Sequence, residues 1–277
     1  MNVPSQATLW NGPAAQAWID AQETIDQLFQ PLEALLVETL AAQNAAKRVL
    51  DVGCGTGGTT LALARVPGRD RDCVGIDVSA PMLAVARARA ERAGVPASFV
   101  CADAENHTFT PASFDLIVSR FGVMFFGDPA RAFANLRRAA APHAAMRCIV
   151  WRSAAENPFM TTAERAAAPL LPDLPARPVD GPGQFSFADA SRVREILERS
   201  DWQDIDIQPI DVTCRMPEPA LSTYVARLGP VGIALREVDE STRSEVLRTV
   251  RAAFAPFVEG AEVQFQAACW LLNARAR

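Results

Sequence analysis

The amino-acid sequence predicts an α/β protein with a doubly wound, mostly parallel β-sheet. Short apolar segments alternate with helical patterns between residues 47 and 151, as in sheets that place a helix between successive parallel strands. These segments are apolar almost throughout, which is typical of strands that helices cover on both faces. A glycine-rich turn follows the first segment, at the edge where such sheets bind their ligands. The predicted strands are 47–52, 73–77, 97–101, 114–119 and 146–151.

Composition and charge limit the classes of function. With 49% hydrophobic and 21% charged residues in a chain of 277, the protein is typical of globular proteins and not of disordered or fibrous ones. The 27 basic residues are dispersed and are outnumbered by 32 acidic residues, so we expect no nucleic-acid partner. The expected partner is a small-molecule substrate, bound by a monomer or a homodimer.

Location and redox state follow from other absences in the sequence. No apolar run reaches the roughly 18–20 residues that span a bilayer, and residues 1–10 lack the basic and apolar parts of a signal peptide. The six cysteines form no Cys-x-x-Cys pair, and several lie in apolar stretches such as 147–150. We therefore expect a reduced, cytoplasmic protein with no membrane insertion, no disulfides and no metal site.

Helical patterns precede and connect the strands. Residues 1–44 are predicted to form an N-terminal helical cap, because apolar side chains from Ile25 to Leu40 recur at spacings of three and four. Pro31 interrupts this stripe, so we expect the helix to break near Gln30.

Two further helices are predicted within the sheet region. The first covers about 80–93, because Ser79 is a favourable N-cap and Gly94 stands where a helix-terminating glycine belongs. The second opens at Asp128 and runs to about residue 140.

Beyond residue 151 the pattern changes. Residues 152–188 are rich in proline and are predicted to form an irregular insertion on the substrate side. Residues 189–277 are predicted to complete the core of 45–151. Their expected elements are a helix at 189–199, strands at 204–213 and 262–272, and a helical insertion at about 217–260.

The glycine-rich turn predicts an adenosine-containing ligand. Gly53-x-Gly55-x-x-Gly58 lets the backbone approach a ligand closely, and Asp77 at the end of the second strand can accept hydrogen bonds from both ribose hydroxyls. NAD(P) and S-adenosylmethionine both satisfy this pattern. The acids Asp51 and Asp103 favour S-adenosylmethionine, because they would repel a pyrophosphate but suit an amine and a sulfonium.

Four segments resemble the motifs of class I S-adenosylmethionine-dependent methyltransferases. Residues 49–57 resemble the first motif, 75–83 the second, 102–104 the third and 114–119 the fourth. The chain is similar in particular to the ubiquinone/menaquinone type of small-molecule methyltransferases. The resemblance implies a Rossmann-like seven-stranded sheet in the order 3-2-1-4-5-7-6, with the last strand antiparallel and helical cap insertions.

The resemblance also implies which residues hold the cofactor S-adenosylmethionine. Asp51 with the backbone of the first glycines would hold the methionine part, and Asp77 would hold the ribose. Other members of the set would pack on the adenine, bind its amino group or lie beside the sulfonium. In full the implied residues are Asp51, Gly53, Cys54, Gly55, Gly57 (methionine end), Asp77 (ribose), Val78, Met82, Asp103, Ala104 (adenine) and Ser119 (sulfonium).

The substrate should lie beyond the carboxyl ends of strands four and five. Arg120 is a candidate clamp for a substrate carboxylate, although a solvated or ion-paired arginine is the more common case. The N-terminal tryptophans resemble a segment that folds over the cofactor, and they could close the site or only staple a helix to the body. The pocket candidates are Trp10, Trp18, Arg120, Phe121, Met124, Phe125, Phe126 and Trp151.

Methyl transfer from a sulfonium is an in-line displacement that depends mainly on alignment and on excluding water. A general base is needed only for some acceptors, and the candidates for it are Glu156, Asp128 and His107. The function expected is methyl transfer to a small, partly apolar metabolite at oxygen, nitrogen or carbon. An NAD(P)-binding oxidoreductase and a non-catalytic module that binds S-adenosylmethionine remain as alternatives.

One departure from the family pattern concerns the fifth strand. Family members commonly have a Gly-Gly turn before it, where this chain has Pro142, His143, Ala144 and Ala145. We expect an altered local turn there, on the sheet edge opposite the site.

Overall fold

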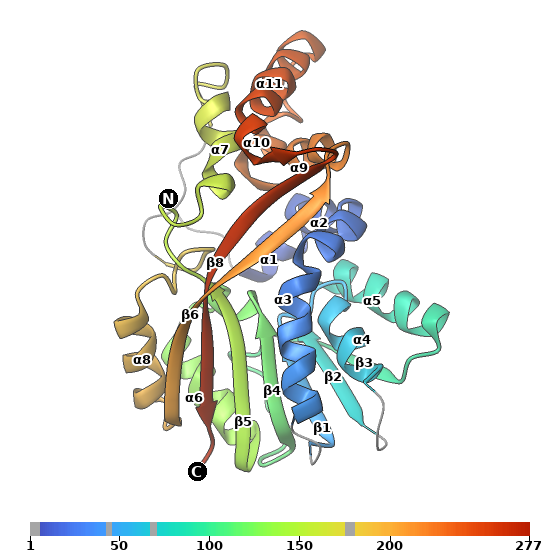
Figure 1. The fold of residues 1–277 in the computed structure, drawn as a ribbon. Helices are drawn as coiled ribbons and strands as arrows, with labels where there is room; N and C mark the ends of the chain where they lie inside the picture. The colour runs from blue at the N-terminus through green and yellow to red at the C-terminus, as the bar shows by residue number, and fades with distance from the viewer. Residues whose placement is uncertain (1–5, 43–45, 67–70, 175–180) are drawn as a thin grey trace.

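The computed structural model describes residues 6–42, 46–66, 71–174 and 181–277 (Figure 1). The end of the predicted cap at 43–44 and the part of the predicted irregular insertion at 175–180 lie outside these residues. No helix in the described ranges is both long enough and apolar enough to cross a membrane.

A single sheet organises the chain. β1 to β5 run parallel in the order β3-β2-β1-β4-β5, and β8 then pairs antiparallel with both β5 and β6. The predicted strand order and the antiparallel last strand are confirmed, with a two-residue β7 added beside β8. The strands are β1 Arg48–Val52, β2 Asp72–Asp77, β3 Ala97–Cys101, β4 Phe114–Arg120, β5 Ala140–Trp151, β6 Gln203–Pro217, β7 Val258–Glu259 and β8 Glu262–Arg275.

Helices cover both faces of the sheet, which explains the nearly continuous apolar strands. In Figure 1, α3 (Gln22–Ala42) and α4 (Gly58–Ala64) lie in front of the sheet, and α6 (Pro129–Ala139) lies behind it. α5 (Ala80–Ala93) packs at the β3 edge, and α8 (Ala190–Arg199) packs against α6 and β6.

The helix ends at Ser79 and Gly94 are confirmed. The Ser79 hydroxyl accepts a hydrogen bond from the Met82 amide, and Gly94 has a positive φ of 60° that favours glycine. The predicted break near Gln30 is wrong, because α3 continues through Pro31. A proline lacks the amide that bonds the preceding turn, but burial of the apolar face on both sides of it holds the helix together.

The fifth strand begins earlier than predicted. β5 starts at Ala140 and not at 146, so the segment predicted as a turn belongs to an irregular start of the strand. Its register against β4 shifts between the pairs that Ala140 and Ala145 make, and His143 has a φ of 63°. A bulge of this kind accommodates Pro142, which has no amide to donate to the ladder.

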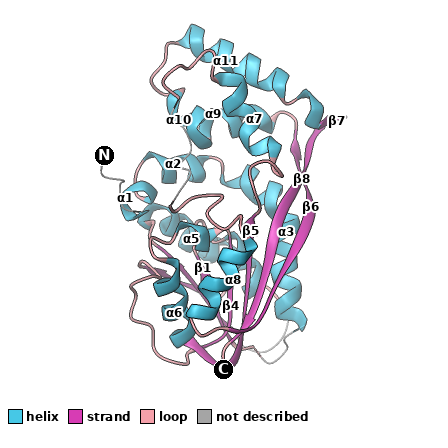
Figure 2. Cartoon of the chain, turned by 90° about the vertical axis from the view of Figure 1, so that its left-hand side faces the viewer, coloured by secondary structure: helices cyan, strands magenta, loops and turns pink. Residues whose placement is uncertain are grey.

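A second, helical part stands on a long two-stranded ribbon. β6 and β8 stay paired from Gln203 and Arg275 to Pro217 and Glu262, and they extend past the other strands (Figures 1 and 2). The ribbon carries α9 (Ala220–Arg227), α10 (Gly229–Ala234), α11 (Glu240–Ala253) and the short η2 (Ala255–Phe257).

The sequence predicted an irregular insertion after β5, but part of this insertion is helical. It contains α7 (Pro158–Ala167), which packs against α11. Phe159 on α7 stacks on Phe265 of β8 with 3.5 Å between ring centres. Burial of this aromatic side chain stabilises α7, although the many nearby prolines indicated irregular structure in the sequence.

Candidate functional site

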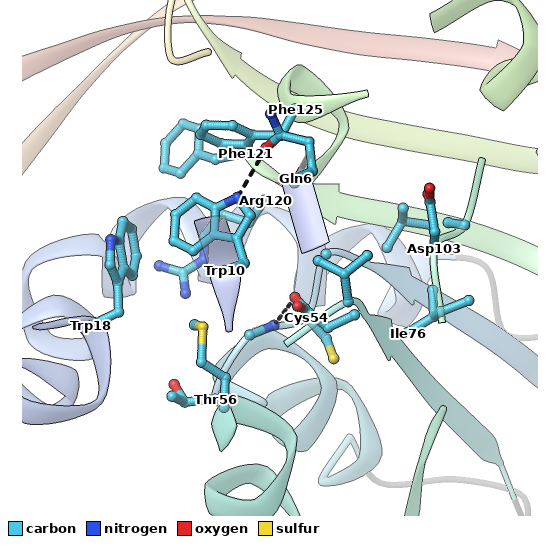
Figure 3. Close-up of a pocket in the computed structure, with 18 of the residues that line it drawn as sticks. Gln6, Trp10, Trp18, Cys54, Thr56, Ile76, Asp103, Arg120, Phe121 and Phe125 are labelled. Atoms are coloured by element: carbon cyan, nitrogen blue, oxygen red, sulfur yellow. Dashed lines mark hydrogen bonds between the residues drawn. The ribbon is translucent and has the colours of Figure 1, made fainter. Parts of the chain in front are cut away.

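A cavity of about 370 Å³ lies at the carboxyl ends of β1, β2 and β4. Its size falls in the range of small-molecule sites, roughly 300–1,000 Å³. α1 (Gln6–Trp10), α2 (Pro13–Asp20) and the start of α3 cover it, and the short η1 (Gly122–Phe125) borders it. Figure 3 shows Trp10 on one side of the cavity, across from Cys54 and Thr56 of the glycine loop.

The glycine loop and Asp77 are joined directly. One carboxylate oxygen of Asp77 accepts from the Gly55 amide at 2.8 Å, and the other accepts from the Ser79 amide at 2.8 Å. Gly53 and Gly55 have φ values of 69° and 54°, which residues other than glycine adopt at a cost. Burial raises the pKa of Asp77. Each of its oxygens still has a lone pair for a ligand hydroxyl.

The third predicted acid lies at the far side of the cavity. Asp103 accepts from the Glu105 amide at 2.9 Å and from the Asn106 side chain at 3.0 Å. Glu105 in turn accepts from the Gly127 and Asp128 amides and pairs with Arg131. These bonds hold the loop after β3 against the loop after η1. The four residues predicted to contact the adenine, Val78, Met82, Asp103 and Ala104, all line the cavity.

The covering helices are pinned to the core by Asn11, a residue that sequence reasoning missed. Its side chain donates to the Val78 carbonyl at 2.9 Å and accepts from the Ala80 amide at 3.0 Å. Trp10 then lies edge-to-face with Trp18 and Phe125, at 6.0 and 5.3 Å between ring centres. Both tryptophans therefore line the cavity and also hold the covering helices in place.

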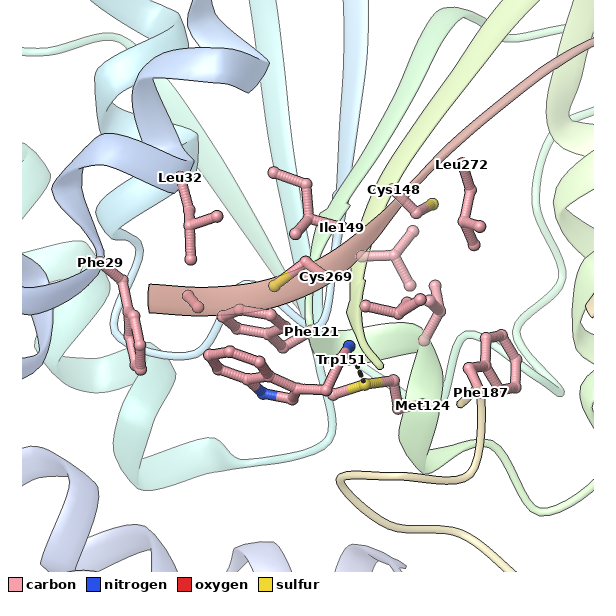
Figure 4. Packing of buried hydrophobic residues seen from close by; sticks show 14 of the residues in the cluster. Phe29, Leu32, Phe121, Met124, Cys148, Ile149, Trp151, Phe187, Cys269 and Leu272 are labelled. Carbon is pink, nitrogen blue, oxygen red and sulfur yellow. Dashed lines mark hydrogen bonds between the residues drawn. The ribbon is translucent and has the colours of Figure 1, made fainter. Parts of the chain in front are cut away.

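The aromatic wall has a second layer behind it. Phe121, with a φ of 70°, lines the cavity and stacks on Trp151 at 4.3 Å between ring centres (Figure 4). The Trp151 amide donates to the Met124 sulfur at 3.4 Å. Trp151 and Met124 are buried and do not line the cavity, whereas Phe125 and Phe126 do. Trp151 thus supports Phe121 from behind, and Met124 in turn contacts Trp151.

Three residues assigned to the cofactor lie behind the cavity wall. Asp51 is 2% exposed and accepts from the Thr60 hydroxyl at 2.6 Å. Ser119 is fully buried, donates to the Val52 carbonyl at 2.8 Å and accepts from the Gly122 amide at 3.1 Å. Gly57 faces α5 and β3, where a Cβ would lie 2.9 Å from the Ala86 Cβ. In this structure they shape the loops around the site and do not line it.

None of the three base candidates lines the cavity. Glu156 bonds to Arg152 and Ser153, which hold its pKa below the usual value. Asp128 caps α6 by accepting from the Arg131 amide at 3.1 Å. His107 packs edge-to-face on Phe109.

Several lining residues come from helices that the sequence presented only as a cap. α1 supplies Gln6, and α3 supplies Gln22, Asp26 and Phe29. The apolar stripe of α3 predicts which face it buries against the sheet. The stripe does not predict where the polar residues in the first turns of α3 lie, because their position depends on the angle at which α3 crosses the glycine loop.

The buried carboxyl of Asp51 gives a prediction for pH dependence. Burial raises its pKa from 3.8 to about 6, so the folded protein binds this proton more tightly than the unfolded chain does. The free energy of unfolding should therefore fall as pH rises through the interval from about 4 to about 6. Asp51→Asn should remove this part of the fall and raise stability at neutral pH. Denaturant titrations from about pH 4 to pH 7 measure the change in slope.

A matched control has the opposite sign. Hydrogen bonds from Thr242 lower the pKa of Asp239, the N-cap of α11, so this residue stabilises the fold above its unfolded pKa. Asp239→Asn should therefore lower stability at neutral pH. Burial also raises the pKa of Asp77 and Glu33. These two groups therefore contribute, together with Asp51, to the dependence of the wild-type free energy of unfolding on pH. Identical slopes for Asp51→Asn and wild type would contradict the prediction.

The fold and the cavity together define a class of protein. A sheet ordered β3-β2-β1-β4-β5-β8-β6 with an antiparallel β8, and a glycine loop joined to an acid on β2, form the class I methyltransferase architecture. Residues 49–143 match the family described as methyltransferase domain. Over these residues the chain is therefore similar to class I S-adenosylmethionine-dependent methyltransferases.

Two curated relatives are named as methyltransferases of small molecules. A demethylmenaquinone methyltransferase of Thermus thermophilus is 41% identical over 104 residues, which are 37% of this chain and 46% of the relative. An aklanonic acid methyltransferase of a Streptomyces species is 31% identical over 135 residues, which are 47% of this chain and 61% of the relative. The chain thus matches 46% and 61% of the length of these two relatives.

Solved structures share the fold over more of the chain. The YcgJ protein of Bacillus subtilis has a TM-score of 0.55 at 17% identity, covering 87% of this chain and 97% of that one. A Haemonchus contortus phosphoethanolamine N-methyltransferase in complex with S-adenosylmethionine has a TM-score of 0.52 at 16% identity, covering 87% and 52%. The [4+2]-cyclase SpnF has a TM-score of 0.59 at 18% identity, covering 100% and 97%. At these identities the likeness extends to the fold alone.

Proposed function

We propose that the protein transfers a methyl group from S-adenosylmethionine to a small, partly apolar acceptor. The observation that carries the proposal is the charge of the cavity. Its lining combines the glycine loop and Asp77 with three further acids, which are Asp26, Asp103 and Glu105. Arg120 is the one basic side chain in the described lining. An acidic cavity suits a ligand that carries a sulfonium and an ammonium, and it disfavours the pyrophosphate of NAD(P).

The residues of the cavity fit this cofactor. Asp77 would take the ribose hydroxyls with its remaining lone pairs, and Val78 and Met82 would pack on the adenine. Asp103 and the Ala104 backbone would face the adenine amino group. When bound, S-adenosylmethionine supplies an electrophilic methyl group on a positively charged sulfur.

The rest of the lining acts on the acceptor side. Trp10, Trp18, Phe121 and Phe125 form an aromatic cover that excludes water and favours a flat or apolar acceptor. The described lining contains no histidine, lysine or tyrosine. This composition favours an acceptor that reacts as an anion or that releases its proton to solvent, and it makes alignment the main contribution of the protein.

Calorimetric titration with S-adenosylmethionine, S-adenosylhomocysteine, NADH and NADPH tests the proposal. We expect micromolar binding of the two sulfur compounds, about −8 kcal/mol, and no binding of the nicotinamide nucleotides. A screen of phenols, quinols, carboxylic acids and amines for release of S-adenosylhomocysteine then finds the acceptor. Binding of NAD(P)H instead, or of none of the four, overturns the proposal. Binding without turnover in any class of acceptor supports a non-catalytic module.

A further inference from the structure

We propose that Arg120 and Asp26 hold the amino-acid end of the cofactor, with the guanidinium on its carboxylate and the aspartate on its ammonium group. The inference rests on the proposed function, since it concerns how this chain binds the same ligand. It assigns the amino-acid end to two residues that lie 94 positions apart, on β4 and α3, and not to Asp51.

Arg120 ends β4 and points its charge into the cavity. Its Nε donates to the Thr59 hydroxyl at 3.2 Å, and its guanidinium carbon lies 5.7 Å from the centre of the Phe29 ring. These two contacts fix the plane of the group. Among the described residues, the hydrogen bond of Arg120 uses its Nε, and its charge acts on the nearby Glu33 carboxyl without a salt bridge to it. Its terminal nitrogens are therefore available for a carboxylate, which a guanidinium binds through two parallel hydrogen bonds.

Asp26 is held by one oxygen and leaves the other available. Its Oδ2 accepts from the Gln22 side chain and from Arg89, and Arg89 is anchored in turn on the Thr56 carbonyl at 2.7 Å. No described group bonds to Oδ1. Arg89 is thereby committed to positioning Asp26, and it is not itself among the residues that line the cavity.

The two charges meet over the first turn of α4. A Cβ built on Gly58 would lie 2.9 Å from the Asp26 Oδ1, 3.3 Å from the Glu33 Oε2 and 3.7 Å from an Nη of Arg120. Glu33 is a second carboxylate near Arg120, but it is not among the residues that line the cavity. Opposite charges gathered beside the glycine loop suit the carboxylate and the ammonium group of an α-amino acid, which are both bonded to its Cα.

The other candidates for these roles are excluded by position. Asp51 is buried behind the loop and bonded to Thr60, so it does not reach the cavity. Residues 1–46 contain no lysine, arginine or histidine, so the covering helices supply no cation. Arg120 is therefore the cation that the described cavity offers to a carboxylate, and a substrate acid would have to compete with the cofactor for it.

Binding of two ligands that differ only in the amino-acid part tests the inference. S-adenosylhomocysteine carries it, and 5′-methylthioadenosine keeps the adenosine and the sulfur without it. Arg120→Met keeps a long side chain over Phe29, and Asp26→Asn keeps the hydrogen-bonding shape of the carboxylate. Each variant should weaken binding of S-adenosylhomocysteine at least tenfold, and each should change binding of 5′-methylthioadenosine by less than about twofold. Arg120→Lys, which keeps the charge but not the paired hydrogen bonds, should fall between Arg120→Met and wild type.

Arg152→Met is the matched control. Arg152 likewise follows a strand of the sheet and lies over an aromatic ring, 5.4 Å from the centre of Trp270, but it is outside the cavity. It should leave both affinities unchanged. Equal losses for the two ligands in Arg120→Met, or no loss for either, contradict the inference. A wild-type protein that binds neither ligand overturns the proposed function itself, so the two failures are distinguishable.

Discussion

Replacement of Asp77 by alanine should weaken binding of S-adenosylhomocysteine by one to two orders of magnitude. Hydrogen bonds to a charged group contribute roughly 1.5–3 kcal/mol each, and about 1.4 kcal/mol corresponds to a factor of ten. The variant loses the contacts to the ribose. It also releases the Gly55 amide, which the carboxylate now holds at 2.8 Å, so the loop itself becomes less ordered. Calorimetric titration of the two proteins measures the difference.

Asp72→Ala is the control on the same strand. Asp72 is the exposed first residue of β2, at the end opposite Asp77, so its removal should leave the affinity unchanged. Because Asp77 also accepts from the Ser79 amide, thermal unfolding of both variants without ligand must accompany the titration. An unchanged affinity in Asp77→Ala would show that the ribose does not bind at this acid.

Gly122→Ala should have the largest effect on stability among the predicted variants. Gly122 packs backbone to backbone on the glycine loop, and a Cβ on it would lie 2.4 Å from the Val52 carbonyl oxygen and 2.7 Å from the Gly53 Cα. Neither is the end of a flexible side chain, so the loop must move. We expect a loss of about 1–3 kcal/mol or more in the free energy of unfolding, together with weaker binding of S-adenosylhomocysteine. Denaturant unfolding and ligand-induced thermal shifts measure the two effects.

Gly183→Ala separates this packing from a general cost of replacing glycine. A Cβ on Gly183 meets nothing within 4 Å, and its backbone does not have a positive φ. This control should change stability by no more than about 0.5 kcal/mol. If Gly122→Ala proves as mild as the control, the two loops do not have to touch for the site to form.

The sequence predicted what local signals or recognised motifs determine. Helix α5 was placed correctly because Ser79 and Gly94 mark its ends within one segment of chain. The order of the strands followed from four motifs whose arrangement is typical of one family. Pro31 misled the prediction, because local propensity opposes a helix there and only tertiary burial of α3 overrides it.

The candidate site was predicted less completely, for a geometric reason. The motifs predict that Asp51 and Ser119 lie near the cofactor, but they do not indicate which side of the loop these side chains face. Pairing between distant residues is equally hidden. Asp26 and Arg120 are brought together by the crossing of α3 over β4, and Asn11 bonds to Val78, the residue after β2, across 67 positions. No local pattern in the sequence records such contacts.

The ribbon of β6 and β8 has a consequence for how this protein can change. The chain leaves the sheet after Pro217 and returns at Glu262, and these two residues face each other as the last pair of the ladder. Residues 218–261 therefore form an insertion between the two strands of a hairpin. The cavity lining, in contrast, comes from residues 6–127. An insertion at the tip of this hairpin can change in length without shifting a strand register. It still contacts the cover of the cavity, because α9 packs on α2 and Arg227 pairs with Asp20, so changes in the insertion can reach the site through α2.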